Sequence, residues 1–242
     1  MDITVGKALA DFKVKALMSM PRLAWTDNMA TMSAVIHTLG IPLRTVTGAF
    51  WGQSLTNGIE DTLSEGDCDA ILFVDYDSVF RPNTVSALAA LMAHGGWDAI
   101  APLQVKRGDG TFMLSLHGVE PHEKVTIPPT WFDKPVQRVA TAHFGCTLIR
   151  TSLIEKMARP WFHEEPDVDG GYRGPHVDAD MHFWSRFDEA GGRLGVATAV
   201  SIGHLEVKTA WPSLSNAGGR VYTDPAGFWN GERPAEAHGV IE

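Results

Sequence analysis

The stretch Ala70-Ile-Leu-Phe-Val-Asp75-Tyr-Asp77 decides the fold prediction, because five apolar residues run directly into two carboxylates. A continuous apolar run of this kind is typical of a strand that is buried on both faces of a parallel sheet. A carboxylate inside such a layer would lose its hydration without compensation, so we expect the strand to end at Asp75. Ligands of open α/β sheets bind at the carboxyl ends of strands, which makes Asp75 and Asp77 candidate site residues.

The two carboxylates favour a divalent metal bound together with a nucleotide. Hard oxygen ligands on a short turn suit Mg²⁺ or Mn²⁺, and such an ion in turn suits a diphosphate. An Asp-x-Asp triplet is also an ordinary turn sequence, since Asp side chains hydrogen-bond to neighbouring backbone groups. The apolar run before the triplet and the order of elements around it favour the metal interpretation.

The first half of the chain alternates between strand and helix patterns. Asp27 is the predicted N-cap of the first helix, and Gly40 is its predicted end. An alternating order of this kind predicts a parallel sheet with right-handed crossovers and helices on its faces. We expect strands at 13–19, 43–50, 70–75 and 98–105, and helices at 28–39, 54–65 and 82–94.

The rhythm becomes less regular after residue 107, where prolines interrupt the pattern. This predicts a partly antiparallel second half, with a helix that Asp178 and Asp180 cap and a closing Gly203-His204. The loop 163–176 is long for a compact domain, so we expect it to be a mobile flap. The further elements expected are strands at 111–118, 136–142, 144–150 and 194–202, and helices at 151–158 and 180–190.

Composition and length limit the domain organisation and the class of protein. We expect one catalytic domain over 1–208, with a nucleotide-binding half at about 13–107 and an acceptor half at about 108–208. Residues 209–242 are expected to form a C-terminal extension, either a lid or a partly disordered tail. The formal net charge of −9 argues against a broad nucleic-acid-binding face.

Two further absences narrow the class. With only Cys68 and Cys146, the chain has no disulfide framework and no cysteine zinc site. The first residues lack the pattern of a secretory signal, and no apolar stretch is long enough to span a bilayer. We therefore expect a cytoplasmic protein without a membrane span.

Four patterns resemble, in their order and spacing, glycosyltransferases of the GT-A fold, near the family-2-like members of bacteria and their phages. Leu72–Asp77 is similar to the family's Asp-x-Asp metal turn, and His143–Ile149 to the glycine-containing segment that opens its acceptor half. Asp180–Gly191 is similar to a helix that ends in Ala-Gly, and Ile202–His204 to a closing Gly-His. The resemblance implies an α/β, Rossmann-like GT-A domain with a mostly parallel central sheet, in host cytoplasm if it is phage-encoded.

The resemblance also implies the chemistry and the central residues. It implies transfer of a sugar from a nucleoside-diphosphate sugar to a hydroxyl acceptor, with Mn²⁺ or Mg²⁺ as cofactor. Asp77 and His204 would hold the metal, and Asp75 would bind it through water or reach the ribose. A carboxylate–imidazole set favours Mn²⁺. Asp180 would be the general base, with Asp178 as the alternative carboxylate.

Donor and acceptor contacts follow from the same resemblance. Ala179 stands where the family often has Glu, and Thr56-Asn57 where it often has Arg-Asn. The expected donor-binding residues are Pro21, Arg22, Asn57, Asp75, Tyr76, Lys106 and Arg107, and the expected acceptor-binding residues are Phe144, Gly145, Trp161 and Trp184.

Two other functions fit parts of the sequence. Asp75-Tyr-Asp77-Ser-Val79 also matches the nucleophile motif of haloacid-dehalogenase-like phosphatases, in which Asp75 would attack phosphorus and Asp77 would be the acid/base. A GT-A-shaped module that binds a nucleotide or glycan without turnover is the second alternative. The donor, UDP- or GDP-linked, stays open. So does the acceptor, which is a glycan, a protein, a small molecule or a modified DNA base.

Overall fold

A computed structural model describes residues 12–21, 23–108, 110–119, 127–172, 176–213 and 219–223. The chain forms two compact units. The first consists of Met1–Lys106 and Gly110–His204, and the second of Arg107–Asp109 and Leu205–Glu242. The predicted boundary at residue 208 and the predicted halves of the catalytic domain stay predictions.

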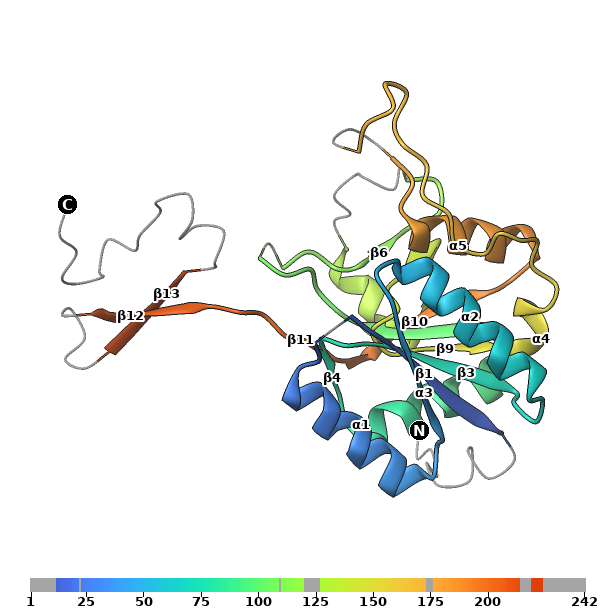
Figure 1. Cartoon of the computed structure of the whole chain (residues 1–242), viewed down its shortest axis with the longest axis horizontal. Coiled ribbons are helices and arrows are strands. Elements are labelled where there is room, and N and C mark those ends of the chain that lie inside the picture. The colour runs from blue at the N-terminus through green and yellow to red at the C-terminus, as the bar shows by residue number, and fades with distance from the viewer. Residues whose placement is uncertain are drawn as a thin grey trace. The chain divides into compact units, whose positions relative to one another are not determined.

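A seven-stranded sheet forms the centre of the first unit (Figure 1). In sheet order, its strands are β2 (Leu43–Thr47), β1 (Val14–Met20), β3 (Ala70–Asp75), β9 (Thr147–Arg150), β5 (Ala99–Leu103), β10 (Leu194–Ser201) and β7 (Val136–Arg138). β1 pairs in parallel with β2 and β3, and β5 with β10. β9 is antiparallel to both β3 and β5, and β7 is antiparallel to β10. The mostly parallel sheet and the antiparallel contribution from the second half are confirmed.

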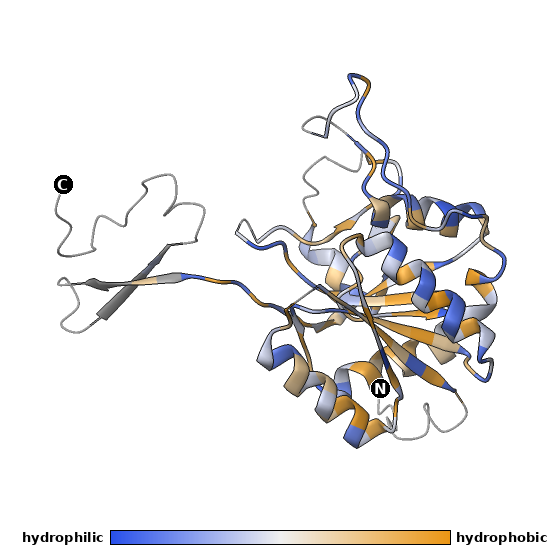
Figure 2. Cartoon of the chain, viewed as in Figure 1, coloured by the Kyte–Doolittle hydropathy of each residue, from blue (hydrophilic) through white to orange (hydrophobic). Residues whose placement is uncertain are grey.

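Helices cover both faces of this sheet, because alternate side chains of each strand point to opposite faces. Helices α1 (Thr26–Leu39) and α3 (Pro82–Gly95) pack on one face, where the core is almost entirely aliphatic. On the other face lie α2 (Trp51–Ser64), α4 (Thr151–Ile154) and α5 (Ala179–Glu189). Hydropathy colouring shows how continuously apolar the central strands are (Figure 2).

The core under α5 is built from aromatic rings. Phe144 meets Trp51, Phe73 and Phe183 edge to face, with ring centroids 5.1–5.4 Å apart. Trp184 stacks on Phe144 and its indole N–H donates to the carbonyl of Ala142. Such ring pairs add to the burial energy, so the start of α5 is held firmly against the sheet.

The first helix differs from its prediction at its start. It begins at Thr26 with Trp25 in the N-cap position, and no side chain caps it, so the prediction of Asp27 as N-cap is wrong. Gly40 ends it as predicted, with a φ of 65° that a residue without Cβ adopts readily. The buried stripe of the helix is Asn28, Met32 and Val35.

Other predicted elements are shorter in the structure. The strand expected over 43–50 stops at Thr47, because Trp51 begins α2 and packs its ring against Phe144 and Phe162. The strands expected over 111–118 and 136–142 are reduced to an antiparallel pair and to β7. The short elements here are β6 (Leu114–Ser115), β8 (Thr141–Ala142) and the 3-10 helix η1 (Pro129–Asp133).

The second unit contains an antiparallel hairpin, β12 (Thr209–Ser213) and β13 (Gly219–Thr223). The backbone N–H of Gly108 donates to a carboxylate oxygen of Glu206, at 3.0 Å, within this unit. The predicted C-terminal extension therefore contains regular structure. Within the described ranges, no helix has the length and apolar character that crossing a bilayer requires.

Candidate active site

The carboxyl end of β3 is joined to the end of the first unit by two short strands. β4 (Ser78–Val79) pairs antiparallel with β11 (Gly203–His204), and Ser78 lies opposite His204. This pairing brings the imidazole next to Asp77, with 3.3 Å between His204 Nε2 and Asp77 Oδ2. The two side chains are only 10% and 7% exposed. A separation of 127 residues in the chain thus becomes a direct contact.

The backbone fixes the protonation pattern of the His204 ring. Nδ1 lies 2.9 Å from the carbonyl oxygen of Val105, which only accepts, so Nδ1 carries a proton. In the neutral ring, Nε2 then presents a lone pair toward the carboxylate of Asp77. Two electron-pair donors facing each other need a proton or a cation between them. A second hydrogen bond from the far ring nitrogen is the usual arrangement of a metal-ligating histidine.

The number of protein ligands restricts which ion the site suits. No cluster of three His, Cys, Asp or Glu side chains able to hold a metal exists among the described residues. A pair of protein ligands does not make a closed structural site, but Mg²⁺ and Mn²⁺ commonly take remaining ligands from phosphates and water. Asp77 and His204 therefore fit an ion that is shared with a diphosphate.

Asp75 is held by side chains from two other elements. Its Oδ1 accepts hydrogen bonds from Ser19 Oγ, at 2.9 Å, and from Trp51 Nε1, at 3.3 Å. Burial raises the pKa of Asp75 to about 6; the charges of Asp77 and Asp180 act in the same direction, and these hydrogen bonds act against it. The raised pKa indicates three carboxylates near one another, in a site that a cation would stabilise.

Asn28 and Gln104 form a buried frame around the Asp75–Ser78 turn. Asn28 is fully buried on α1, and its Nδ2 donates to the carbonyls of Asp75, at 3.0 Å, and Ser78, at 2.6 Å. Gln104 Nε2 donates to Ser78 Oγ, at 3.0 Å, and to the carbonyl of Gly203, at 3.4 Å. These two amides link β3, β4 and β11, and so fix the relative positions of Asp77 and His204. Neither Asn28 nor Gln104 was predicted from the sequence.

Gly145 packs directly beneath this frame. A Cβ at this position would lie 2.5 Å from Ser78 Oγ and 2.6 Å from Gln104 Oε1, so only glycine fits without displacement. Its N–H donates to Nδ1 of His143, whose Nε2–H donates to the carbonyl of Pro102. Burial lowers the pKa of His143 to about 4, so this ring is neutral. The structure gives Gly145 a packing role, and its contact with an acceptor stays a prediction.

Asp180 lies in the first turn of α5. Its Oδ1 accepts the N–H of Met181, at 2.8 Å. Burial and, after it, the charge of Asp178 raise the pKa of Asp180, while Lys106 acts in the opposite direction. Asp178 occupies the N-cap position without making a side-chain cap, and instead pairs with His176 at 2.9 Å. Of the two candidate bases, Asp180 is the one whose charge reaches Asp75.

The predicted donor-binding residues are distributed unevenly. Tyr76 is half-buried beside the site, and Lys106 is exposed with its charge reaching Asp180. Pro21, after β1, and Asn57, on α2, are exposed. Arg107 belongs to the second unit, and Arg22 lies outside the described residues. The donor contacts of all these residues stay predictions.

Three of the predicted acceptor-binding residues are core residues in the structure. Phe144, Trp161 and Trp184 are at most 3% exposed and pack in the aromatic cluster under α5. Side chains with so little exposed surface offer almost no ring face to a sugar. Trp184 nevertheless lines a cavity along α5, and the acceptor contacts of these three residues stay predictions.

We compared the chain and its fold with known proteins. No protein-family model matches the chain, and no curated protein sequence matches it significantly. Solved structures do match. A197 from STIV superposes with a TM-score of 0.54 at 16% identity, over 80% of this chain and 86% of that one. GalNAc-T7, solved with UDP, GalNAc and Mn²⁺, gives 0.54 at 12% identity. The chain has the GT-A fold.

A third structure with this GT-A fold agrees. Glucosyl-3-phosphoglycerate synthase from Mycobacterium tuberculosis, in complex with phosphoglyceric acid, gives a TM-score of 0.50 at 13% identity, over 86% of this chain and 78% of that one. The match to GalNAc-T7 covers 80% of this chain and 44% of that one. The predicted fold is therefore confirmed. In this GT-A fold, Asp75, Asp77 and His204 lie together at the carboxyl end of β3.

Proposed function

We propose that the protein is a metal-dependent glycosyltransferase that moves a sugar from a nucleoside-diphosphate sugar to a hydroxyl acceptor. The observation that carries the proposal is the 3.3 Å contact between Asp77 and His204, with the far ring nitrogen donating to Val105. The GT-A fold supports it, and a structure with this fold, GalNAc-T7, was solved with UDP and Mn²⁺.

Asp77 and His204 would hold Mn²⁺ or Mg²⁺ against the diphosphate of the donor. When bound, the ion neutralises the charge that gathers on the departing diphosphate. Asn28 and Gln104 keep the two ligand-bearing strands in register, so the ligands need no reorganisation during the reaction. Asp75 lies two residues before the ligand Asp77, where its carboxylate would contact water around the ion or the ribose.

Asp180 would act as the general base. Its carboxylate takes the proton of the acceptor hydroxyl as that oxygen forms a bond to the anomeric carbon, while the bond from this carbon to the diphosphate breaks. The raised pKa of Asp180 brings its basicity closer to neutral pH, where a general base works best. A base acting on an acceptor in this way favours inversion at the anomeric carbon.

Calorimetry with UDP and GDP tests the metal site. We expect binding in the presence of Mn²⁺ and its loss with a chelator, and we expect Asp77→Asn to lose Mn²⁺-dependent binding. Asp27→Asn makes the same chemical change at an exposed position on α1 and should bind as the wild type does. Equal binding with Mn²⁺ and with chelator would overturn the proposal.

The two alternative functions lack a comparable observation. A phosphatase would use Asp75 as its nucleophile, at the end of the chain's first strand, but here β1 and β2 precede β3, and Oδ1 of Asp75 is hydrogen-bonded to Ser19 and Trp51. A non-catalytic binding module would have no use for a carboxylate such as Asp180 near Asp75. The variants described in the Discussion separate this alternative from catalysis.

A further inference from the structure

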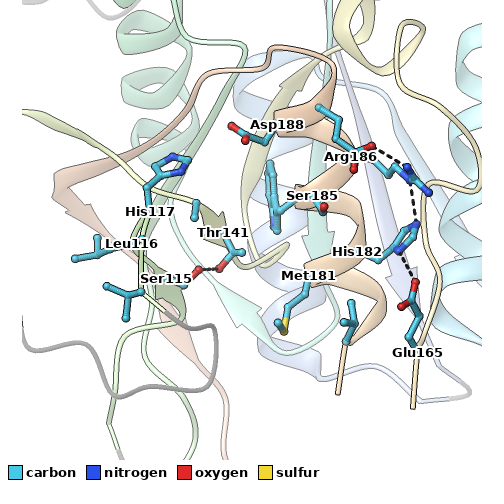
Figure 3. A pocket seen from close by; sticks show the side chains of 16 residues that line it. Ser115, Leu116, His117, Thr141, Glu165, Met181, His182, Ser185, Arg186 and Asp188 are labelled. Carbon is cyan, nitrogen blue, oxygen red and sulfur yellow. Dashed lines mark hydrogen bonds and ion pairs between the residues drawn. The ribbon is translucent and has the colours of Figure 1, made fainter. Parts of the chain in front are cut away.

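A cavity lies along α5 (Figure 3), and Trp184 of the aromatic core is part of its lining. Its volume is about 460 Å³, within the range of pockets that bind small molecules. One wall is α5 from Met181 to Glu189, and the opposite wall is formed by 115–119 and 140–141. Glu165 and Val177, which form a bridge at the base of the 163–176 loop, line one end.

The cavity begins next to the candidate base. Met181, which lines it, follows Asp180 directly, and consecutive Cα atoms are about 3.8 Å apart. Asp180 and Met181 therefore lie in the first turn of the same helix, which Trp184 fixes against the sheet. Asp180 is not itself a lining residue, so an acceptor would reach it from the Met181 end of the cavity.

The charges on the lining disfavour an anionic ligand. Three carboxylates line the cavity, those of Glu165, Asp188 and Glu189. Among its described residues, Arg186 is the only permanent cation. Its guanidinium is already engaged, because Nη1 lies 2.7 Å from Glu189 and Nε lies 3.3 Å from Nε2 of His182. A phosphate or carboxylate would have to compete with Glu189 for Arg186 and would also meet the charges of Glu165 and Asp188.

The remaining polar groups suit hydroxyl groups. Ser115 Oγ and Thr141 Oγ1 hydrogen-bond to each other at 2.8 Å on the wall opposite α5, where β6 pairs with β8. Figure 3 shows this pair facing the helix. Ser185 and His117 are exposed on opposite walls. Carboxylates accept hydrogen bonds from hydroxyl groups, while hydroxyl and neutral imidazole groups both donate and accept.

We infer that this cavity binds the acceptor and that the acceptor is an uncharged, hydroxyl-rich molecule, a saccharide, and not a phosphorylated or carboxylated compound. The acceptor role rests on the proposed function. The ligand class rests only on the lining, so binding can be measured without any transfer.

Saturation-transfer NMR with neutral oligosaccharides of glucose, galactose, mannose and N-acetylhexosamine tests the class, in the presence of Mn²⁺ and UDP or GDP. We expect at least one neutral probe to bind. Ser185→Trp should fill the cavity and weaken that binding at least tenfold, whereas Ser64→Trp, at an exposed position on α2, should change it less than twofold. Absence of binding by every neutral probe, or equal effects of the two variants, overturns the inference.

A charge variant tests the selectivity. Glu189→Gln removes the carboxylate that engages Arg186, so an oligogalacturonate, an anionic probe that the wild type should not bind, should gain detectable affinity. Glu155→Gln makes the same change at an exposed position outside the cavity and should have no such effect. Binding of the anionic probe to the wild type as tightly as any neutral saccharide would contradict the proposed class.

The two proposals fail separately. Saccharide binding that Ser185→Trp abolishes, without Mn²⁺-dependent nucleotide binding, would leave the ligand class and remove the glycosyltransferase. Metal-dependent nucleotide binding with no saccharide in the cavity would leave the glycosyltransferase and remove this inference.

Discussion

The Asp77–His204 region and the cavity along α5 are built in opposite ways. At Asp77 and His204 the side chains are almost entirely buried; the carbonyl of Val105 holds the imidazole, and the amides of Asn28 and Gln104 hold Ser78, next to Asp77. Along α5 the carboxylates of Glu165, Asp188 and Glu189 are 55–57% exposed and pair with other side chains. Burial fixes geometry but makes each charge costly, whereas exposed pairs contribute little to stability. The first region therefore suits a reaction that needs one fixed geometry. The second region suits binding of ligands that differ in shape.

Asp180 is linked to both regions, because its charge reaches Asp75 and its neighbour Met181 lines the cavity. Its replacement should have the largest effect. Asp180→Asn keeps the shape but cannot take a proton, so we expect transfer to fall by about 10²–10⁴-fold while Mn²⁺-dependent donor binding stays within about twofold. Nucleotide release with and without acceptor measures the first, and calorimetry the second. Asp27→Asn, at an exposed position on α1, is the matched control. Unchanged transfer by Asp180→Asn would favour a non-catalytic module or another base.

Asp75→Asn tests the cost of burying charge in the first region. Between the reference pKa of 3.8 and the folded value of about 6, the ionised form loses about 3 kcal/mol of stability. With chelator at pH 8, Asp75 is charged in both states, so we expect Asp75→Asn to be more stable than the wild type by up to about 3 kcal/mol.

The pH dependence of that difference checks its cause. A raised folded pKa means that the stabilising contribution is fully present below pH 3.8 and is lost as the pH rises through about 6. The advantage of Asp75→Asn should therefore shrink steadily from pH 8 to pH 4 in denaturant titrations. Asp27→Asn, which is exposed, should show no such trend. A constant advantage across the range would mean that burial of the charge is not responsible.

Gln104→Leu tests the buried hydrogen bonds that distinguish the Asp77–His204 region from the cavity along α5. We expect Mn²⁺ affinity, measured by electron paramagnetic resonance, to fall by about 10–100-fold, the usual effect of losing an outer hydrogen bond to a metal site. Gln137→Leu also removes a side-chain hydrogen bond, to the carbonyl of Trp131, but far along the sheet at β7, and should leave the affinity unchanged. Equal losses in both variants would show a general destabilisation.

The smallest effect is expected in the second region. Glu189→Ala breaks an exposed pair with Arg186, so the free energy of unfolding should change by less than about 0.5 kcal/mol in denaturant titrations. A loss above about 1 kcal/mol would mean that the charges along the cavity are structural. The contrast between the two regions would then disappear.

The sequence predicted the central sheet better than the second half, for a physical reason, whereas the pairing of Asp77 with His204 was implied only by the resemblance to the GT-A family. The run Ala70–Val74 and the glycine that ends α1 are local signals, and their meaning does not depend on distant contacts. The shortened strands around 111–142 depend on pairings that a local pattern does not specify. Phe144, Trp161 and Trp184, predicted as acceptor contacts, are all core residues, because aromatic residues serve cores and sugar sites alike; of these three, Trp184 also lines the cavity.

Asn28 shows what a closer reading could have found. It shares the helical spacing i, i+4, i+7 with Met32 and Val35, which places it on the buried stripe of α1, while the apolar Met29 and Ile36 are each 37% exposed. A polar residue on such a stripe needs partners, and here these are the carbonyls of Asp75 and Ser78. Gln104 carried no comparable signal, because its partner Ser78 is defined only by the folded chain.

The reversed strand β9 has a consequence for how this molecule can be divided. β3 and β5 do not pair with each other, and only Thr147–Arg150 joins them. A fragment that ended after β5 would lack β9. The edges of β3 and β5 that β9 covers would then be unpaired in the middle of the sheet, where new chains would readily add. The sheet formed by residues 14–103 is therefore no detachable module, because Thr147–Arg150, which completes it, comes later in the chain.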